Sequence, residues 1–223
     1  MSTDLQSADS RALHEPFSMT LRTSGPQAAL AWLVGVLASQ SSTLRASNSF
    51  LVAYTGCPEA VDWLEATVSP PITGHWGQGA ALLGTPWPRI KNWLAAGGPR
   101  QLMALDTLFA YRAPAPNMAP LAQIAAPAMS DAPTPDEFGA TLAGVLNEQS
   151  TPRIQKMVGT ILAHATEILT RKDRGVPVAD LPLLFLQPNL FPSASEILNR
   201  HEPVIAGMRQ SVQDLLKQFP PKP

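Results

Sequence analysis

The sequence is poor in the residues that build disulfides and metal sites. Its single cysteine, Cys57, cannot form an internal disulfide and supplies no thiolate cluster for zinc. The 4 histidines do not stand at ligand spacing from one another, so we expect no metal site. The composition predicts a protein of a reducing compartment that folds without metal ions or other cofactors.

An excess of charge of one sign and a long apolar run are also missing. The formal net charge of −1 gives no broad electrostatic field, which disfavours a nucleic-acid partner. The longest apolar run, Ala28 to Ala38, is far shorter than the ~20 residues that cross a bilayer, so no membrane span is expected. Residues 1–18 contain no apolar stretch typical of a signal peptide, which favours a cytoplasmic location.

Charged residues make up only 15% of the chain, where ~25% is usual. The 23 prolines are about twice the usual ~5% share. A neutral surface of this kind would follow from hidden interfaces, or from an Ala- and Pro-rich composition inherited from a GC-rich genome. Both explanations remain open.

The common catalytic motifs are incomplete. After the dipeptides His14-Glu15 and His201-Glu202, a zinc-protease helix would need a second histidine three residues beyond the glutamate, and neither has one. Gly77-x-Gly79 lacks the third glycine of a dinucleotide-binding loop. No phosphate-binding loop and no nucleophile elbow occur. The sequence therefore predicts a protein that is not an enzyme.

A repeat is present in the middle of the chain. Trp32-Leu33, Trp63-Leu64 and Trp93-Leu94 recur at separations of 31 and 30 residues. A proline stands in front of each copy, where its fixed φ suits the first turn of a helix. We therefore expect the three tryptophans to occupy equivalent buried positions.

A second helix is predicted within each copy. These helices are Thr43 to Tyr54 closed by Gly56, His75 to Leu83 closed by Gly84, and Arg100 to Tyr111 opened after Gly97-Gly98-Pro99. In the third, Leu102, Leu105, Leu108 and Phe109 form an apolar stripe. Since a lone hairpin cannot cover its apolar face, three hairpins of ~30 residues should stack side by side.

This arrangement resembles HEAT- and armadillo-like helical repeats over residues 26–112, and it is similar to bacterial helical-repeat proteins. The resemblance implies an α-solenoid-like stack that offers an extended surface to other proteins.

The predicted fold is all-α, with stacked helical hairpins followed by a C-terminal helical region. The expected parts are a flexible N-terminal tail over 1–20, three hairpins over 21–112, a Pro/Ala-rich linker over 113–134 with one short helix at 121–126, and a C-terminal helical region over 135–219. Within that region, capping signals at Thr134 and Thr151 open two helices, the second one continuous to Leu169. An apolar strap over 176–192 and a last helix over 193–219 follow.

Trp76 and Trp87 lie in the connections that flank the predicted helix from His75 to Leu83. If exposed together and rimmed by His75 and Arg89, they would form a protein-binding hot spot, because aromatic side chains on loops are typical anchors of interfaces. Alternatively, each ring folds back to cap the end of a hairpin. The residue pattern leaves both interpretations open.

The leading hypothesis is a bacterial-type, non-catalytic protein-binding module, such as an adaptor, a secretion-system accessory scaffold or an immunity-type inhibitor. Its partner would be another protein, and a homo-oligomer is left open. The alternative is a helical enzyme or small-ligand-binding domain whose polar site is assembled around His75, His164 or Asp106.

Overall fold

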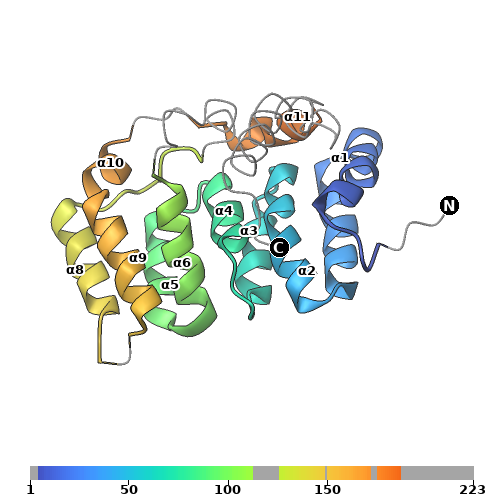
Figure 1. Ribbon diagram of the computed structural model, residues 1–223. Coiled ribbons are helices and arrows are strands. Elements are labelled where there is room, and N and C mark those ends of the chain that lie inside the picture. Colours follow the sequence, from blue (N-terminus) through green and yellow to red (C-terminus); the bar gives the residue numbers. More distant parts are fainter. Residues whose placement is uncertain (1–4, 113–125, 149, 172–174, 187–223) are drawn as a thin grey trace, which may run out of the picture. The chain divides into compact units, whose positions relative to one another are not determined.

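Helices make up all the regular structure of residues 5–112, 126–148, 150–171 and 175–186, which are the residues that the computed structural model describes (Figure 1). No strand occurs in these ranges. The chain divides into two units, residues 1–186 and 187–223, and all described residues belong to the first. The predicted last helix and part of the linker lie outside the described residues, whereas the all-α class holds for those described.

The first element is α1, Ser10–Ser39, which begins ten residues earlier than the predicted end of a flexible tail. The side chain of Asp9 caps it by accepting hydrogen bonds from the backbone N–H of Arg11 and Ala12, both at 3.0 Å. Leu13, Phe17 and Leu21 are spaced four residues apart, so their side chains lie on one buried face of α1. Burial of this face, which extends into the predicted tail, explains why residues 10–20 are helical.

A break divides α1 at Gly25, whose φ of 84° is outside the helical region. The helix resumes at Pro26, which is the proline in front of the first Trp-Leu copy.

The predicted helix pairs follow with small shifts of their ends. Residues 43–54 divide into α2, Ser42–Asn48, and the 3-10 helix η1, Ser49–Thr55, which Gly56 ends with a φ of 65°. The second pair is α3, Glu59–Thr67, with α4, Gly74–Leu82. The third is α5, Trp87–Ala96, with α6, Gly98–Ala110. The predicted existence and order of these helices are confirmed.

The next pair is α8, Pro135–Val145, with α9, Pro152–Ala163. The predicted caps are confirmed, since the hydroxyl of Thr134 accepts a hydrogen bond from the N–H of Glu137 and that of Thr151 accepts one from the N–H of Ile154. The predicted continuous helix to Leu169 is wrong, because His164 leaves the helical conformation and a separate α10, Ala165–Thr170, follows. The predicted strap begins with η2, Val178–Asp180, and α11, Leu181–Phe185.

The second helices of successive pairs lie against one another. In chain order η1 contacts α4, α4 contacts α6, and α6 contacts α9 (Figure 1). We call these four elements the second-helix row. Each also contacts the first helix of its own pair, namely α1, α3, α5 and α8 respectively.

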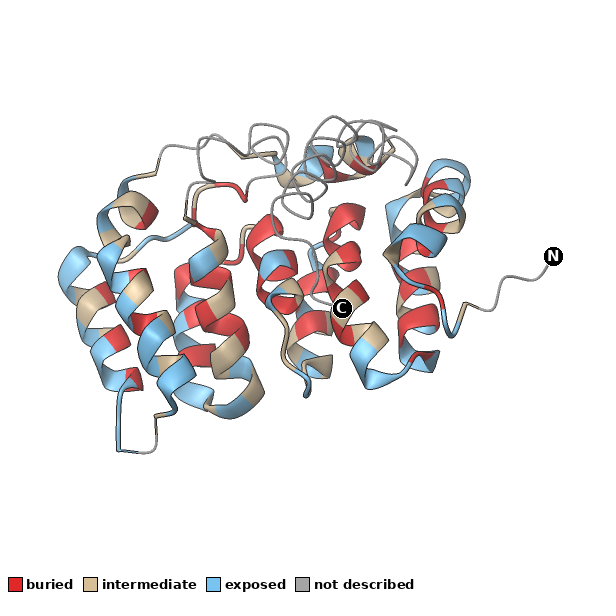
Figure 2. Cartoon of the chain, in the orientation of Figure 1, coloured by how far each residue is buried: buried red, intermediate tan, exposed pale blue. Residues whose placement is uncertain are grey.

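Burial follows the repeat at two positions and departs from it at the tryptophan. The leucine of each Trp-Leu pair is buried, as are the residues three before each tryptophan, which are Ala29, Ala60 and Ile90. Of the tryptophans, only Trp93 is fully buried, while Trp32 and Trp63 are half-buried. The prediction of three equivalent buried rings is therefore wrong for two of them. Buried positions concentrate on η1 and α4 (Figure 2).

The longest described helix, α1, does not reach the apolar character of a bilayer-crossing segment, and neither does any other helix of the described ranges.

Candidate interaction surfaces

Trp76 and Trp87 are core residues, which contradicts the predicted exposed aromatic patch. The exposed fraction of Trp76 is 1% and that of Trp87 is 3%. Trp76 belongs to α4, and its ring stacks on Trp63 of α3 with 5.9 Å between the ring centroids. Both rings therefore pack against neighbouring helices. The helices begin earlier than predicted, so both rings stand in first turns instead of loops.

Trp87 joins the third pair to the fourth. Its ring packs on Phe138 of α8 at 5.5 Å, and its indole N–H donates to the Glu137 carboxylate at 3.2 Å. Lys91 donates to the same carboxylate oxygen at 2.8 Å. Glu137, expected to close a capping box on Thr134, thus binds α5 instead.

His75 does not join Trp87 at a common surface. Its half-buried imidazole lies 5.3 Å from the ring of Phe50 and 3.5 Å from the hydroxyl of Thr73. Burial lowers the pKa of His75 below its ordinary value of 6.5, because a buried imidazole loses the hydration of its charged form. The ring is therefore neutral at pH 7 and packs as an apolar group.

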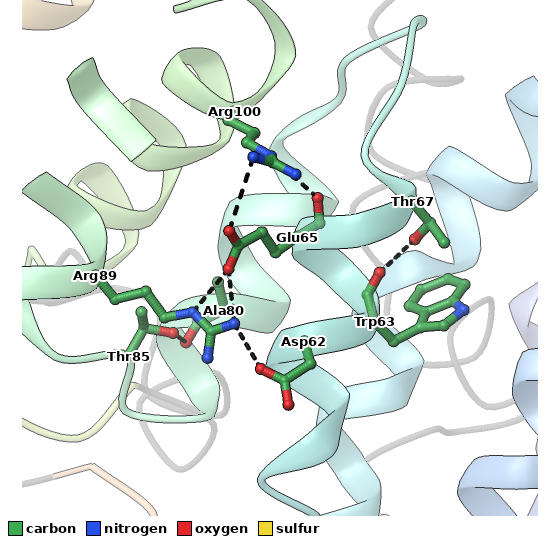
Figure 3. Close-up of polar contacts among 8 residues, drawn as sticks. All are labelled: Asp62, Trp63, Glu65, Thr67, Ala80, Thr85, Arg89 and Arg100. Carbon is green, nitrogen blue, oxygen red and sulfur yellow. Dashed lines mark hydrogen bonds and ion pairs between the residues drawn. The ribbon is translucent and has the colours of Figure 1, made fainter. Parts of the chain in front are cut away.

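Arg89 holds α5 against α3 through two carboxylates. Its guanidinium lies 2.6 Å from both Asp62 and Glu65, and Arg100 of α6 approaches Glu65 from the other side at 3.9 Å (Figure 3). The indole of Trp63 points away from this cluster. Since Arg89 is fully engaged by α3 and also lies over the ring of Trp93 at 5.6 Å, it is a packing residue of the helix pairs.

The cluster determines the charge state of Glu65. Burial alone would raise the pKa of this carboxyl, but hydrogen bonds and charges from Arg89, with the charge of Arg100, outweigh it. The pKa of Glu65 therefore lies below its ordinary value of 4.5.

Replacing Glu65 by glutamine should lower the free energy of unfolding at pH 7 by about 1 kcal/mol, since a half-buried charged hydrogen-bond network is lost. Because the folded-state pKa is depressed, this contribution is complete above about pH 4.5 and is lost as pH falls through the folded-state pKa. Urea unfolding of wild type and Glu65→Gln from pH 7 to pH 3 measures the difference. Glu148→Gln, at an exposed carboxyl, serves as the control, and a Glu65 difference that grew on acidification would contradict the prediction.

The polar residues of the alternative enzyme hypothesis are separate from one another. His164 pairs with Glu167 at 2.9 Å, His75 lies beside Thr73, and Asp106 is 3.9 Å from Arg153. No two of the three contact each other within the described residues. Burial raises the pKa of Asp106, and the Arg153 charge offsets only part of this shift.

One side of α6 is only partly covered, although Leu102 and Phe109 belong to the predicted apolar stripe. Leu102, Asp106 and Phe109 recur at spacings of four and three, which places them on one side of the helix. Leu102 and Asp106 are half-buried, whereas Phe109 is 41% exposed. Arg112 lies over the Phe109 ring, with 4.4 Å between its Cζ and the ring centroid. Aromatic residues and arginine are both enriched at protein interfaces.

Arg153 of α9 reaches across to this side of α6. Its guanidinium lies 3.9 Å from the Asp106 carboxylate and donates long hydrogen bonds of 3.4 and 3.5 Å to the carbonyl oxygen of Ile72. Leu102, Asp106, Phe109, Arg112, Arg153 and Lys156 are referred to below as the α6–α9 face. The spacing of Asp106, Phe109 and Arg112 in the sequence was the available signal for this face, but the long-range contact with Arg153 was not visible there.

The described part of the chain brings together no group of three His, Cys, Asp or Glu side chains that could hold a metal ion. Cys57 is buried, and burial raises the pKa of its thiol. Comparisons of the chain with protein-family models, curated protein sequences and solved structures yield no match, so they assign it to no family.

Proposed function

We propose that this protein is a non-catalytic protein-binding module whose stacked helical hairpins offer an α-solenoid-like surface to another protein. The observation that carries the proposal is the second-helix row, in which η1, α4, α6 and α9 each contact the next. Serial contacts of this kind are typical of helical-repeat proteins, which bind partners along the surface that neighbouring repeats share. This step is an analogy at the level of architecture.

The α6–α9 face supplies a specific place for binding on that row. Phe109 exposes 41% of its surface on a helix whose other large apolar side chains are mostly buried. A few side chains supply most of the binding energy of an interface, and aromatic residues and arginine are frequent among them. An adaptor, an accessory scaffold of a secretion system and an immunity-type inhibitor would each use a surface of this kind.

The test uses a photo-reactive benzoylphenylalanine in place of Phe109 in the full chain, introduced in cells of the source organism. We expect a specific cross-linked protein, and we expect Phe109→Ala to weaken binding of that purified partner by about 2 kcal/mol because a hot-spot side chain is truncated. Calorimetry measures the affinity, and thermal unfolding should show an almost unchanged Tm, since surface substitutions stay within about 0.5 kcal/mol.

The matched control is Leu183 of α11, which is 62% exposed and lies outside the second-helix row. The photo-reactive residue at this position should not capture the same partner, and Leu183→Ala should bind it as wild type does. Equal capture at positions 109 and 183, or unchanged affinity of Phe109→Ala, would contradict the proposed function.

A further inference from the structure

Charged residues are unevenly distributed over the described helices. Helices α3 and α8 carry only acidic charges, namely Glu59, Asp62, Glu65, Asp136 and Glu137, whereas α5 carries the cations Arg89 and Lys91, which pair with some of them. The second helices α6 and α9 are mostly basic, with Arg100, Arg153 and Lys156 against Asp106. Arg100 contacts Glu65 of α3. The other two cations, Arg153 and Lys156, belong to the α6–α9 face.

One cation covers the exposed ring of Phe109, and two more lie on the adjoining helix α9. Arg112 lies directly over the ring, and Arg153 reaches Asp106, which is three residues from Phe109 on the same side of α6. Lys156 follows Arg153 by one helical turn and therefore shares its side of α9. The face combines one apolar anchor with three cations.

The positive charge of this face is poorly neutralised. Asp106 is the one acidic side chain of α6 and α9, and its side chain is only 14% exposed. The Arg153 side chain is 52% exposed, and its contacts with Asp106 and the Ile72 carbonyl oxygen are all long. Arg112 and Lys156 form no ion pair with any described residue. Donors on all three cations thus remain available to an anionic partner.

We propose that the α6–α9 face binds an acidic protein segment that carries an aromatic or aliphatic side chain. The apolar side chain packs on Phe109, and the carboxylates of the segment pair with Arg112, Arg153 and Lys156. The proposal rests on the proposed function and adds the chemistry of the partner to it. Charge complementarity of this kind steers association and selects among partners.

A polypeptide fits this face better than a nucleic acid does. A nucleic acid requires a continuous basic surface, whereas here Asp106 lies among the cations and helices α3 and α8 carry only acidic charges. The exposed Phe109 also favours a ligand with an apolar side chain.

The test measures fluorescence anisotropy of a labelled peptide of about twelve residues, made of glutamate around one central phenylalanine, with the full-length protein. The same peptide with glutamine or with lysine in place of glutamate provides the comparison. We expect only the acidic peptide to bind. Salt should weaken this binding, because exposed charges are screened. Arg112→Glu and Lys156→Glu should each lower its affinity about tenfold, since each reverses one unpaired charge.

Arg22→Glu reverses an exposed charge on α1 and should bind the acidic peptide as wild type does. The melting temperature of each variant reports whether the fold is intact, and two separate variants keep the test decisive if one unfolds. The proposal is overturned if the acidic peptide does not bind, if both reversals leave its affinity unchanged, if the lysine peptide binds equally well, or if a single-stranded oligonucleotide of equal length binds more tightly. Cross-linking at position 109 is independent of charge, so persistence of that cross-link would retain the proposed function and exclude only an acidic partner.

Discussion

Replacing Trp76 by alanine is expected to lower the free energy of unfolding by about 3–5 kcal/mol, the range observed when a large buried aromatic side chain is removed. The ring is 1% exposed on α4 and stacks on Trp63 of α3, so its loss leaves a cavity between the two helices of one pair. Equilibrium unfolding in urea with the full chain measures the change. An exposed Trp76 at an interaction surface would instead leave the free energy of unfolding within about 0.5 kcal/mol.

Met19→Ala provides the control for Trp76→Ala, because Met19 is a large apolar residue of α1 that is 60% exposed. Its effect should stay within about 0.5 kcal/mol. A loss below about 1 kcal/mol for Trp76→Ala would show that the indole is not part of the core.

Replacing Gly77 by alanine should lower the free energy of unfolding by about 2–3 kcal/mol, because the added methyl group overpacks the contact between α4 and α6. A Cβ at this position would lie 2.5 Å from the Asp106 carbonyl carbon and from the Thr107 backbone nitrogen. Both are backbone atoms, so the helices themselves would have to separate. Urea unfolding measures the change, and an increased tilt of α4 from α6 would be visible in a crystal structure of the variant.

Gly159→Ala is the matched control for Gly77→Ala. Gly159 lies inside α9, and a Cβ added there would have no atom within 4 Å apart from the surrounding backbone of α9. Alanine here should raise the free energy of unfolding by about 0.5–1 kcal/mol, since it lowers the entropy of the unfolded chain and favours the helix. If both substitutions stabilised the protein, the close approach of α4 and α6 would be disproved.

Most helices were predictable because their signals are local. A capping hydroxyl at Thr134, a proline in the first turn after it and a left-handed glycine at position 56 each act within a few residues. The helix at 10–20 and the break at His164 were missed because no local signal marks either of them. The first is stabilised by burial of Leu13 and Phe17 against distant elements, and the second lies within an uninterrupted apolar stripe.

The α6–α9 face is formed by contacts between residues far apart in the sequence, which local patterns do not predict. Trp76 and Phe109 are both large aromatic residues near turn signals, yet the first is buried and the second is exposed. Spacing places each residue on a side of its helix, but it does not say which neighbouring helix covers that side. Arg153 reaches Asp106 across 47 positions of the sequence, and only the packing of α9 on α6 brings them together.

By itself, the sequence determined the helical class of the described residues and the order of the helix pairs, since propensity, capping and periodicity act over one or two turns. Only the tertiary structure decided that Trp76 packs within its helix pair, that Trp87 and Arg89 connect helix pairs, and that Phe109 of the α6–α9 face remains exposed. The physical reason is that exposure depends on which helix packs against a side chain, and this is settled by the competition of all apolar faces for burial at once.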